Sequence, residues 1–316
     1  MRPLPRSFAL FGRARDGRAL PHGNDQTRGI TFLLMSVFVF TLMDATAKYL
    51  GESYAPAQVV WARFMGNLAV LALYYRARFF PSLRSRQPMI QFGRALCQLA
   101  SVSLFFTALQ HIGIAEATAI MDMNPVLITL GAALFLGEPV GWRRIAGIGA
   151  AMVGAMIIIR PGMGVFDAAA ILPLIGAFTY AAGALLTRVV RTDSLATSLV
   201  WTVLVGSIAS SAVVPFFWQP IQAEHLWAFV AIGVFGAVSQ ALLIYAFSLA
   251  EAGAIAPFGY TGLVWAALWG WLFWGVLPDR WTVLGAAIIV AAGLYIWYRE
   301  SRQARREMAA HGQGQN

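Results

Sequence analysis

The sequence has one cysteine and few charged residues, and both shortages narrow the classes of protein to which it can belong. Cys97 has no partner for a disulfide, and a lone thiol within an apolar run argues against redox chemistry. Charged residues make up only 12% of the 316 positions, whereas hydrophobic residues make up 59%, and the mean hydropathy is +0.66. A soluble domain needs more charge to cover its surface. The composition therefore excludes an ordinary soluble domain and indicates a membrane protein with several spans.

Motifs that mark several enzyme classes are also missing. The chain lacks a GxxxxGK[ST] phosphate loop, which argues against an ATP-driven pump. It also lacks HExxH and GxSxG motifs and paired histidines within its apolar runs, so an intramembrane enzyme is disfavoured. His111 and His225 lie in or near predicted outer loops, too isolated to suggest a metal site. We therefore expect no catalytic residues and no bound metal.

The apolar runs divide into ten segments, each able to cross a bilayer as a helix. The predicted spans are residues 28–50, 56–75, 89–110, 114–136, 144–160, 168–188, 195–218, 226–249, 253–276 and 281–298. The connections between them are short, which leaves no room for a separate soluble domain. The helical bundle itself must therefore carry the function.

The positions of the 23 Lys and Arg residues predict how these spans are oriented. If both termini lie in the cytoplasm, only Lys48, Arg160 and Arg280 fall on the outer side, and Arg63 falls within a span. This distribution follows the positive-inside rule. The net charge of +9 then reflects topology and contact with anionic lipid, since no nucleic-acid-binding motif is present. Residues 1–27 lack the apolar core of a secretory signal, and we interpret them as a cytoplasmic tail in preference to an organellar transit peptide.

The chain contains two copies of one unit. A shift of 138 residues aligns LFFTALQHIGIAEATAI with LLIYAFSLAEAGAIAPF and LFLGEPVGWRRIAG with LFWGVLPDRWTVLG. Earlier in each half the shift becomes 140 and places Trp61 on Trp201. Five spans in each copy, an odd number, force the second copy to run through the membrane in the opposite sense. Inverted repeats are typical of transporters, although duplication also builds passive or scaffold membrane proteins.

Six stretches carry a resemblance to a known family: RGITFLLMSVFVFTLMDATAKYL, QVVWARF, AEATAIMDMNPV, LFLGEPVGWRRIAG, AGAIAPFGYTGLVWA and LPDRWTVLGAAIIVAAGLYIWYRE. Over residues 28–300 the chain resembles bacterial EamA-type members of the drug/metabolite transporter superfamily. It is most similar to a branch of S-adenosylmethionine and riboflavin uptake proteins and exporters of amino acids and their derivatives. The resemblance implies ten helices, cytoplasmic termini, alternating access and no bound cofactor, and it transfers no ligand.

We therefore predict an all-α integral membrane protein of the bacterial inner membrane, with ten transmembrane helices in two inverted five-helix repeats and both termini inside. The predicted parts are a basic tail over 1–27, a first EamA-like repeat over 28–160, a second over 168–298 and a basic tail over 299–316. The expected partners are a small-molecule metabolite and the lipid bilayer, with no nucleic acid. A homodimer stays open as an alternative to the monomer.

The stretch FTLMDATAKYL places Asp44 and Lys48 one helical turn apart inside an apolar run. Arg63 lies at a comparable depth in the second span, about 10 Å below the outer surface. Because consecutive antiparallel helices are usually neighbours, we expect an ion pair between Asp44 and Arg63. Lys48 would join it through an i,i+4 contact or extend to the outer headgroups. The three residues are candidates for substrate binding or coupling, and a structural lock between two helices is the alternative.

The stretch AIMDMNPVL places a second acid, Asp122, beside a proline. Pro125 cannot donate to the carbonyl four residues earlier, so we expect a helix kink with polar groups such as Asn124 around it. Asp122 and Asn124 are candidates for binding or coupling, and satisfaction of a polar bundle interior is the alternative. The 138-residue shift sets Tyr260 against Asp122, which makes Tyr260 and the nearby Trp265 candidates for lining a cavity.

These features predict a secondary transporter that moves a small organic metabolite by alternating access, driven by the proton gradient, by exchange or by the solute's own gradient. Acids combined with aromatic residues suit an S-adenosylmethionine-like, riboflavin-like or amino-acid-derived solute. Asp44 and Asp122 are the deepest carboxylates, so at least one should control pH-dependent flux. A passive channel or a membrane sensor is the alternative, and an intramembrane enzyme is less favoured.

Overall fold

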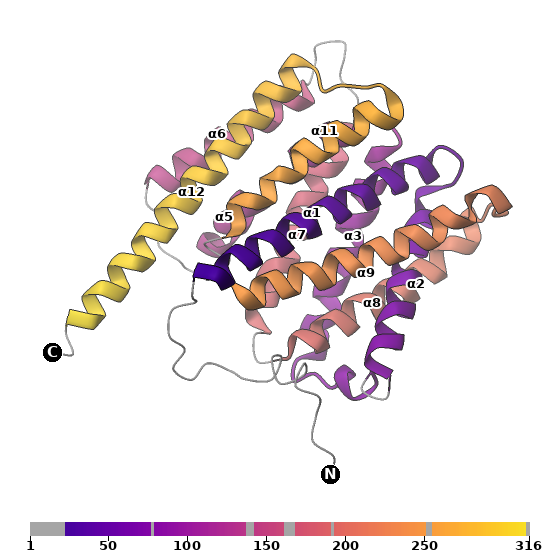
Figure 1. The fold of residues 1–316 in the computed structure, drawn as a ribbon, viewed down its shortest axis with the longest axis horizontal. Helices are drawn as coiled ribbons and strands as arrows, with labels where there is room; N and C mark the ends of the chain where they lie inside the picture. The colour runs from indigo at the N-terminus through magenta and orange to yellow at the C-terminus, as the bar shows by residue number, and fades with distance from the viewer. Residues whose placement is uncertain are drawn as a thin grey trace.

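A computed structural model describes residues 23–76, 79–136, 142–160, 168–190, 193–250 and 255–313. These residues form helices and connecting loops and contain no strand (Figure 1). The first half comprises α1 (Gly23–Gly51), α2 (Pro56–Tyr75), α3 (Pro88–Leu109), α4 (Ile114–Met121), α5 (Asn124–Leu136) and α6 (Trp142–Ile159). The second comprises α7 (Ile171–Val189), α8 (Leu195–Val213), α9 (Leu226–Leu249), the 3-10 turn η7 (Ala256–Tyr260), α11 (Thr261–Trp274) and α12 (Arg280–Gln313). Further 3-10 turns are η3 (Pro81–Leu83), η4 (Ala168–Ala170), η5 (Val214–Phe217) and η6 (Ala223–His225).

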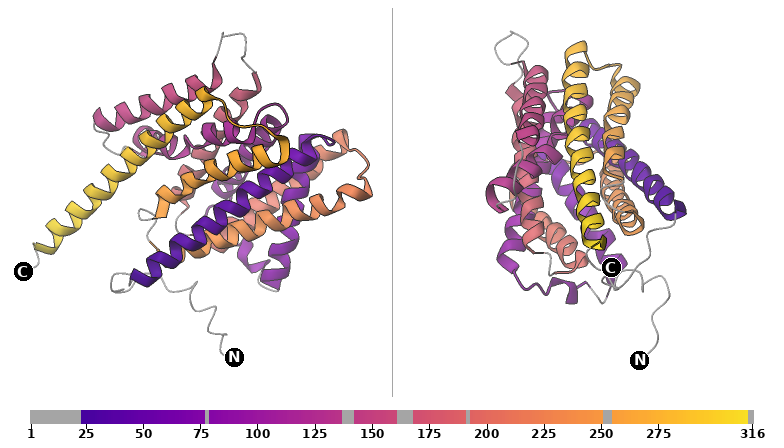
Figure 2. Two further views of the ribbon diagram at one scale, coloured as in Figure 1. Left: turned by 45° about the horizontal axis from the view of Figure 1, so that its top comes forward. Right: turned by 90° about the vertical axis from the view of Figure 1, so that its left-hand side faces the viewer.

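Among the described residues, eight helical segments are long and apolar enough to cross a membrane. α6, with 18 residues, corresponds to the fifth predicted span, and its apolar stretch covers Ile145–Ile159. Within the ninth predicted span, α11 has 14 residues and follows η7. The last helix is longer than predicted, since α12 continues beyond residue 298 to Gln313 and includes much of the predicted basic tail. The start of α1 and the end of α12 lie at the same end of the bundle (Figures 1 and 2).

The fourth helical segment is interrupted in both halves. α4 ends at Met121 and α5 begins at Asn124, so the predicted span over 114–136 is broken beside Pro125, as expected for a residue without a backbone N–H. In the second half, η7 ends at Tyr260 and α11 begins at Thr261. The two interruptions therefore occupy matching positions in the repeat.

The helices of each half pack mainly on helices of the other half, so the halves do not form separate units. α1 packs mainly on α9, and α3 packs mainly on α7. α9 begins at Leu226, 138 residues after α3 begins at Pro88, so α9 is the repeat counterpart of α3. The contact of α1 with α9 is therefore the repeat equivalent of the contact of α7 with α3. α6 likewise packs on its own repeat counterpart α12, which runs beside it in Figure 1. Such paired contacts are what a two-fold relation between two repeats produces.

Two pairs of glycines bring helices of different halves into backbone contact. A Cβ atom on Gly66 of α2 would lie 2.4 Å from the Cα atom of Gly233 on α9. A Cβ atom on Gly154 of α6 would lie 2.8 Å from the carbonyl oxygen of Gly285 on α12. Close packing of small residues drives helix association in lipid, where the hydrophobic effect between helices is weak. These crossings hold the halves together.

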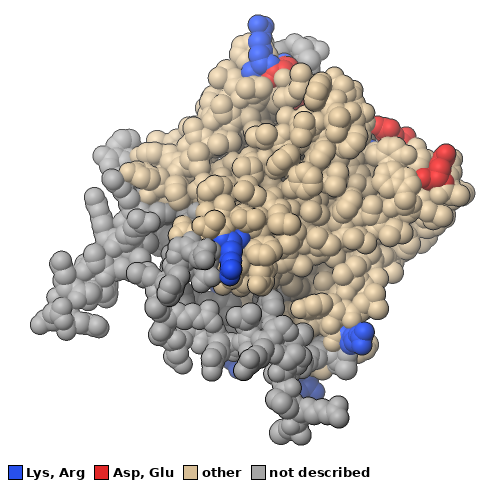
Figure 3. All heavy atoms as spheres, in the orientation of Figure 1, with Lys and Arg blue, Asp and Glu red and all other residues tan. Residues whose placement is uncertain are grey.

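The outside of the bundle is apolar. Leu73, Phe135 and Phe216 are 73%, 80% and 82% exposed. In Figure 3 the acidic side chains lie along the upper and right-hand edges of the visible face, and most visible Lys and Arg side chains lie along its lower part. The surface between them is formed by uncharged residues. Charge at two ends of an apolar band is the pattern of a bundle that spans a membrane.

Candidate functional site

The first polar cluster within the bundle, the α1–α2 cluster, consists of Asp44 on α1 and Arg63 and Asn67 on α2. All three residues are half-buried. The charges of Asp44 and Arg63 interact, but among the described residues these two side chains do not form an ion pair within 4.0 Å. The Arg63 guanidinium lies instead 5.3 Å from the ring centroid of Phe106 on α3, in a cation–π contact. The predicted ion pair is therefore wrong, although the two charges are electrostatically coupled.

The packing of α1 explains the difference. The prediction took α1 and α2 as neighbours because they are consecutive, whereas α1 packs mainly on α9 and only marginally on α2. As a result Arg63 Nε is buried and has no hydrogen-bond acceptor in the described part of the chain. One turn along α2, Asn67 Oδ1 is also buried without a donor there. Gly236 of α9 leaves room for Asn67 Oδ1, since a Cβ atom at Gly236 would lie 2.7 Å from that oxygen.

The second polar cluster, the broken-span cluster, consists of Thr118, Asp122, Asn124 and Tyr260 at the two helix interruptions. Thr118 and Asp122 are one turn apart, and the backbone N–H of Asp122 donates to the carbonyl of Thr118 at 2.9 Å. Tyr260 lies close enough for its phenol to interact with the charge of Asp122. Asp122 and Tyr260 are therefore near each other in the structure, although they are 138 residues apart in the sequence. They are also the two residues that the repeat alignment sets against each other.

Four side-chain atoms of the broken-span cluster are buried without a hydrogen-bond partner among the described residues: Thr118 Oγ1, Asp122 Oδ2, Asn124 Oδ1 and Tyr260 OH. Buried polar groups are normally paired, and an unpaired one costs roughly 1–3 kcal/mol. Asp122 forms no ion pair within the described ranges. The sequences of α4, α5, η7 and α11 contain no Lys, Arg or His. The broken-span cluster is therefore rich in acceptors and has no basic residue on its own segments.

Gly293 of α12 leaves the space that the Tyr260 hydroxyl occupies. A Cβ atom on Gly293 would lie 1.7 Å from the hydroxyl oxygen and 2.7 Å from Cζ of Tyr260. No side chain fits there while Tyr260 keeps its position. The glycine thus lets α12 and the Tyr260 phenol approach each other closely.

Lys48 caps the end of α3. Its Nζ donates to the carbonyl oxygens of Leu109 at 2.6 Å and Ile112 at 2.8 Å. These carbonyls lie at and just beyond the helix end, where they lack partners and where the helix dipole favours a cation. Of the two predicted alternatives for Lys48, the i,i+4 contact with Asp44 is not formed among the described residues, because the end of α3 supplies acceptors within the reach of Lys48. Contact with the outer headgroups stays a prediction.

Trp265 belongs to an aromatic wall between α11 and α1. Its ring lies 5.0 Å from that of Phe38 in a T-shaped contact and 6.4 Å from that of Trp269 in a stacked one. Trp269 Nε1 in turn donates to Thr41 Oγ1 at 3.1 Å. Trp265 is half-buried, so part of its indole surface stays open. Its role in lining a cavity stays a prediction.

A cavity of about 520 Å³ lies where α1, α3, α6 and α11 end. Both halves contribute to its walls, which are largely apolar. The charged residues that line it are Lys48, Glu116, Arg160 and Asp279. The predicted topology places this end of the bundle outside the cell, so we name it the outer cavity.

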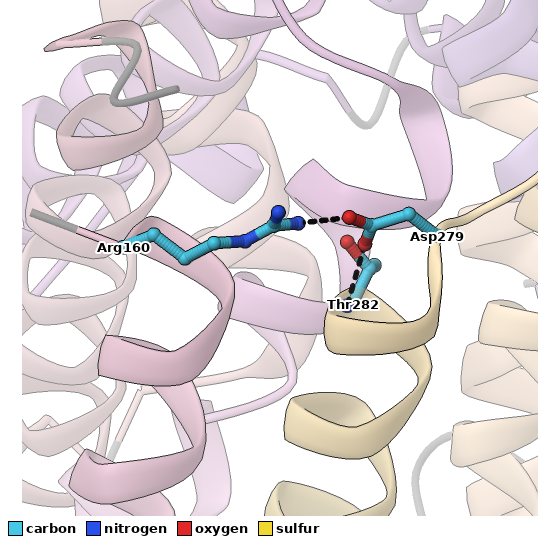
Figure 4. A network of polar contacts seen from close by, with 3 residues as sticks. All are labelled: Arg160, Asp279 and Thr282. Carbon is cyan, nitrogen blue, oxygen red and sulfur yellow. Dashed lines mark hydrogen bonds and ion pairs between the residues drawn. The ribbon is translucent and has the colours of Figure 1, made fainter. Parts of the chain in front are cut away.

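At the outer cavity, Arg160 and Asp279 form an ion pair (Figure 4). Arg160 follows α6 and Asp279 precedes α12, so the pair joins the two halves. Asp279 Oδ1 also accepts from the backbone N–H of Thr282 at 2.8 Å, which caps α12. Partial burial alone would raise the pKa of Asp279, but hydrogen bonds from Thr282 and Arg160 outweigh it and hold that pKa below its usual value.

At the opposite end of α3, Asp193 ties the start of α8 to the segment before α3. Ser85 Oγ donates to Asp193 Oδ2 at 2.5 Å, and the backbone N–H of Arg86 donates to Oδ1 at 3.1 Å. Gln91 Nε2 donates to Oδ2 at 3.0 Å. These hydrogen bonds, the one from Ser85 most strongly, hold the pKa of Asp193 below its usual value. We name this group the inner network.

The sequence analysis missed Asn67, Thr118 and Gly293. Asn67 is one turn from Arg63, and Thr118 is one turn from Asp122, so both share a helix face with an intramembrane charge. A neutral polar residue four positions from such a charge is the signal that could have found them. Gly293 carried no signal, because a glycine does not reveal which side chain packs on it.

Comparison with known proteins gives the family. The EamA-like transporter family matches the chain twice, over residues 27–160 and 167–298. A riboflavin transporter of Rhizobium johnstonii is 30% identical over 286 residues, which cover 88% of this chain and 93% of that protein. A pseudopaline exporter of Pseudomonas aeruginosa is 29% identical, covering 84% and 94%. An S-adenosylmethionine uptake transporter of Rickettsia felis is 24% identical, covering 88% and 95%.

The fold also occurs in a solved crystal structure, which aligns with a TM-score of 0.58 at 17% identity and covers 90% of this chain and 99% of that one. The bacterial transporter relatives and the membrane-spanning helices together make this a multi-pass protein of the bacterial inner membrane. The resemblance seen in the sequence is confirmed: the chain belongs to the EamA-like transporter family of the drug/metabolite transporter superfamily.

Proposed function

We propose that the protein is a secondary transporter that carries a small organic metabolite across the inner membrane by alternating access. Ten transmembrane helices form two inverted repeats with both termini in the cytoplasm. The observation that carries the proposal is the broken-span cluster, where interruptions at matching repeat positions coincide with unpaired buried polar atoms. Interrupted helices at a repeat interface form substrate sites in transporters built this way.

The two polar clusters line the solute site, together with the aromatic wall. Its residues are Asp44, Arg63, Asn67, Thr118, Asp122, Asn124, Tyr260 and Trp265. Arg63 Nε supplies an unused donor, and the broken-span cluster supplies unused acceptors. The open indole surface of Trp265 suits a planar apolar part of the solute. Lys48 stands in the outer cavity, on the solute's path to this site.

The two ends of the bundle differ in a way that supports alternating access. The outer cavity is open, whereas the inner network is closed by hydrogen bonds on Asp193. Access from the other side requires the inner network to separate and the outer cavity to close. The proton gradient, exchange or the solute's own gradient drives the cycle, with Asp44 and Asp122 as the carboxylates that couple it to protons.

Counterflow in proteoliposomes tests the proposal. Liposomes that contain the purified protein are loaded with unlabelled riboflavin, S-adenosylmethionine or an amino-acid mixture and diluted into the same labelled solute. A carrier gives a transient, saturable overshoot of label for at least one probe, and protein-free liposomes give none. Equilibration without overshoot would instead establish a passive channel, and binding without flux would establish a sensor.

A further inference from the structure

The broken-span cluster differs from the α1–α2 cluster in that it lacks a cation. Asp44 interacts with Arg63, whereas Asp122 interacts with a neutral phenol. The segments that form the interruptions carry no basic residue. A carboxylate inside a membrane needs a compensating positive charge or a proton. A proton or a positive charge from outside these segments therefore has to compensate Asp122.

Three unpaired atoms of the cluster can act on one ligand group. Thr118 Oγ1 and Asp122 Oδ2 belong to residues four positions apart at the end of α4, where Asp122 is the C-cap residue. Tyr260, from the second half, is near enough for its phenol to interact with the charge of Asp122, and its hydroxyl occupies the place that Gly293 leaves free. All three oxygens can accept a hydrogen bond. Together they form an acceptor site with one formal negative charge.

A primary ammonium group matches this site. It carries one positive charge and three N–H donors and has no acceptor. Each donor can meet one of the three oxygens, and the bonds are strengthened by charge. A solute carboxylate or phosphate would be repelled by Asp122. A proton would neutralise Asp122 but would bring no group that binds all three oxygens at once.

We propose that Thr118, Asp122 and Tyr260 bind a primary ammonium group of the transported solute, so that the substrate is an amine. This assignment rests on the proposed carrier function and narrows it. Among the solutes named for the relatives, S-adenosylmethionine carries such a group and riboflavin does not. Gly293 is a positioning residue, because it acts through Tyr260.

Counterflow with chemically matched probes tests the assignment. The amine probes are S-adenosylmethionine and the free amino acids, and the controls without a primary amine are riboflavin and the N-acetylated amino acids. At least one amine probe should show saturable counterflow, and its N-acetylated form should compete at least about tenfold more weakly. Asp122→Asn should raise the half-saturating concentration of the amine about tenfold or more, and Tyr260→Phe should raise it by a smaller factor.

Two controls separate binding from folding. Glu224→Gln neutralises an exposed carboxylate outside both clusters and should leave counterflow unchanged. Size-exclusion profiles and thermal midpoints report whether each variant folds, and Thr118→Val replaces Asp122→Asn if that protein is lost. The assignment is overturned if riboflavin or an N-acetylated amino acid is carried as well as the free amines, or if the folded variants keep wild-type affinity. Absence of counterflow with every probe would overturn the carrier function as well.

Discussion

The α1–α2 cluster and the broken-span cluster both place charge within the apolar bundle, but they balance it differently. The first contains a carboxylate and a guanidinium whose charges interact, and Phe106 lies against the guanidinium. The second contains a carboxylate among oxygen atoms that have no partner in the described ranges. Removing one member of a balanced cluster is destabilising, because the other charge stays buried without compensation. An unbalanced one costs stability, which is expected of a site that a solute completes.

The largest effect should follow from breaking the balanced cluster. Arg63→Gln leaves Asp44 without its cation in a low-dielectric interior, and we expect a loss of up to about 3–5 kcal/mol in the free energy of unfolding. Thermal unfolding in detergent and the yield of folded protein measure it. The double variant Asp44→Asn/Arg63→Gln should recover much of the loss. A stable Arg63→Gln protein without flux would show that Arg63 acts on the solute rather than on the fold.

A smaller effect should follow at the edge of the broken-span cluster. Gly293→Ala places a methyl group where the Tyr260 hydroxyl lies, so the phenol must move, and overpacking of this kind costs about 1–3 kcal/mol. Counterflow should weaken because Tyr260 leaves its position. Gly149→Ala on α6 is the matched control, since a Cβ atom there meets nothing within 4 Å. Equal behaviour of the two variants would refute the packing of Tyr260 against α12.

Proton dependence separates the two carboxylates. Because Arg63 already compensates Asp44, whereas Asp122 has no cation on its own segments, Asp122→Asn should flatten the pH profile of flux more than Asp44→Asn. Initial rates at a series of outer pH values measure this. If neutral replacement of both residues left a proton-driven flux unchanged, neither carboxylate would couple transport to protons.

The smallest effect should come from the carboxylates that the protein fully satisfies. The pKa of Asp193 is held below its usual value, so its contribution to stability is fully present above the unfolded pKa of about 3.9 and is lost as the pH falls through the folded pKa. Asp193→Asn should therefore lower the thermal midpoint near neutral pH and reduce its decline below about pH 4. If the thermal midpoints of this variant and the wild type depended on pH in the same way, the inner network would not contribute to stability.

The sequence was sufficient for those features that depend on local chemistry. The apolar runs predicted helices, Pro125 predicted the break beside Asp122, and the repeat alignment paired Asp122 with Tyr260, whose phenol interacts with the charge of Asp122 in the structure. Each of these follows from composition, from the missing N–H of a proline or from internal duplication. None requires knowledge of which helices touch.

The features that depend on helix neighbours could not be predicted. The ion pair between Asp44 and Arg63 failed because α1 packs on α9, a helix far along the chain. Lys48 meets carbonyls of the end of α3, about 60 residues away, which no local pattern indicates. The contact of Gly293 with Tyr260 likewise depends on how α12 crosses the second interruption.

Chemical labelling at the break tests the central claim, that the broken-span cluster is reached in turn from each side of the membrane. In a Cys97→Ala background, Asn124→Cys provides a single thiol beside Asp122. A membrane-impermeant maleimide should label it in both right-side-out and inside-out vesicles, and a transported solute should slow labelling from either side. Labelling from one side only, whatever the solute or pH, would contradict alternating access at this site.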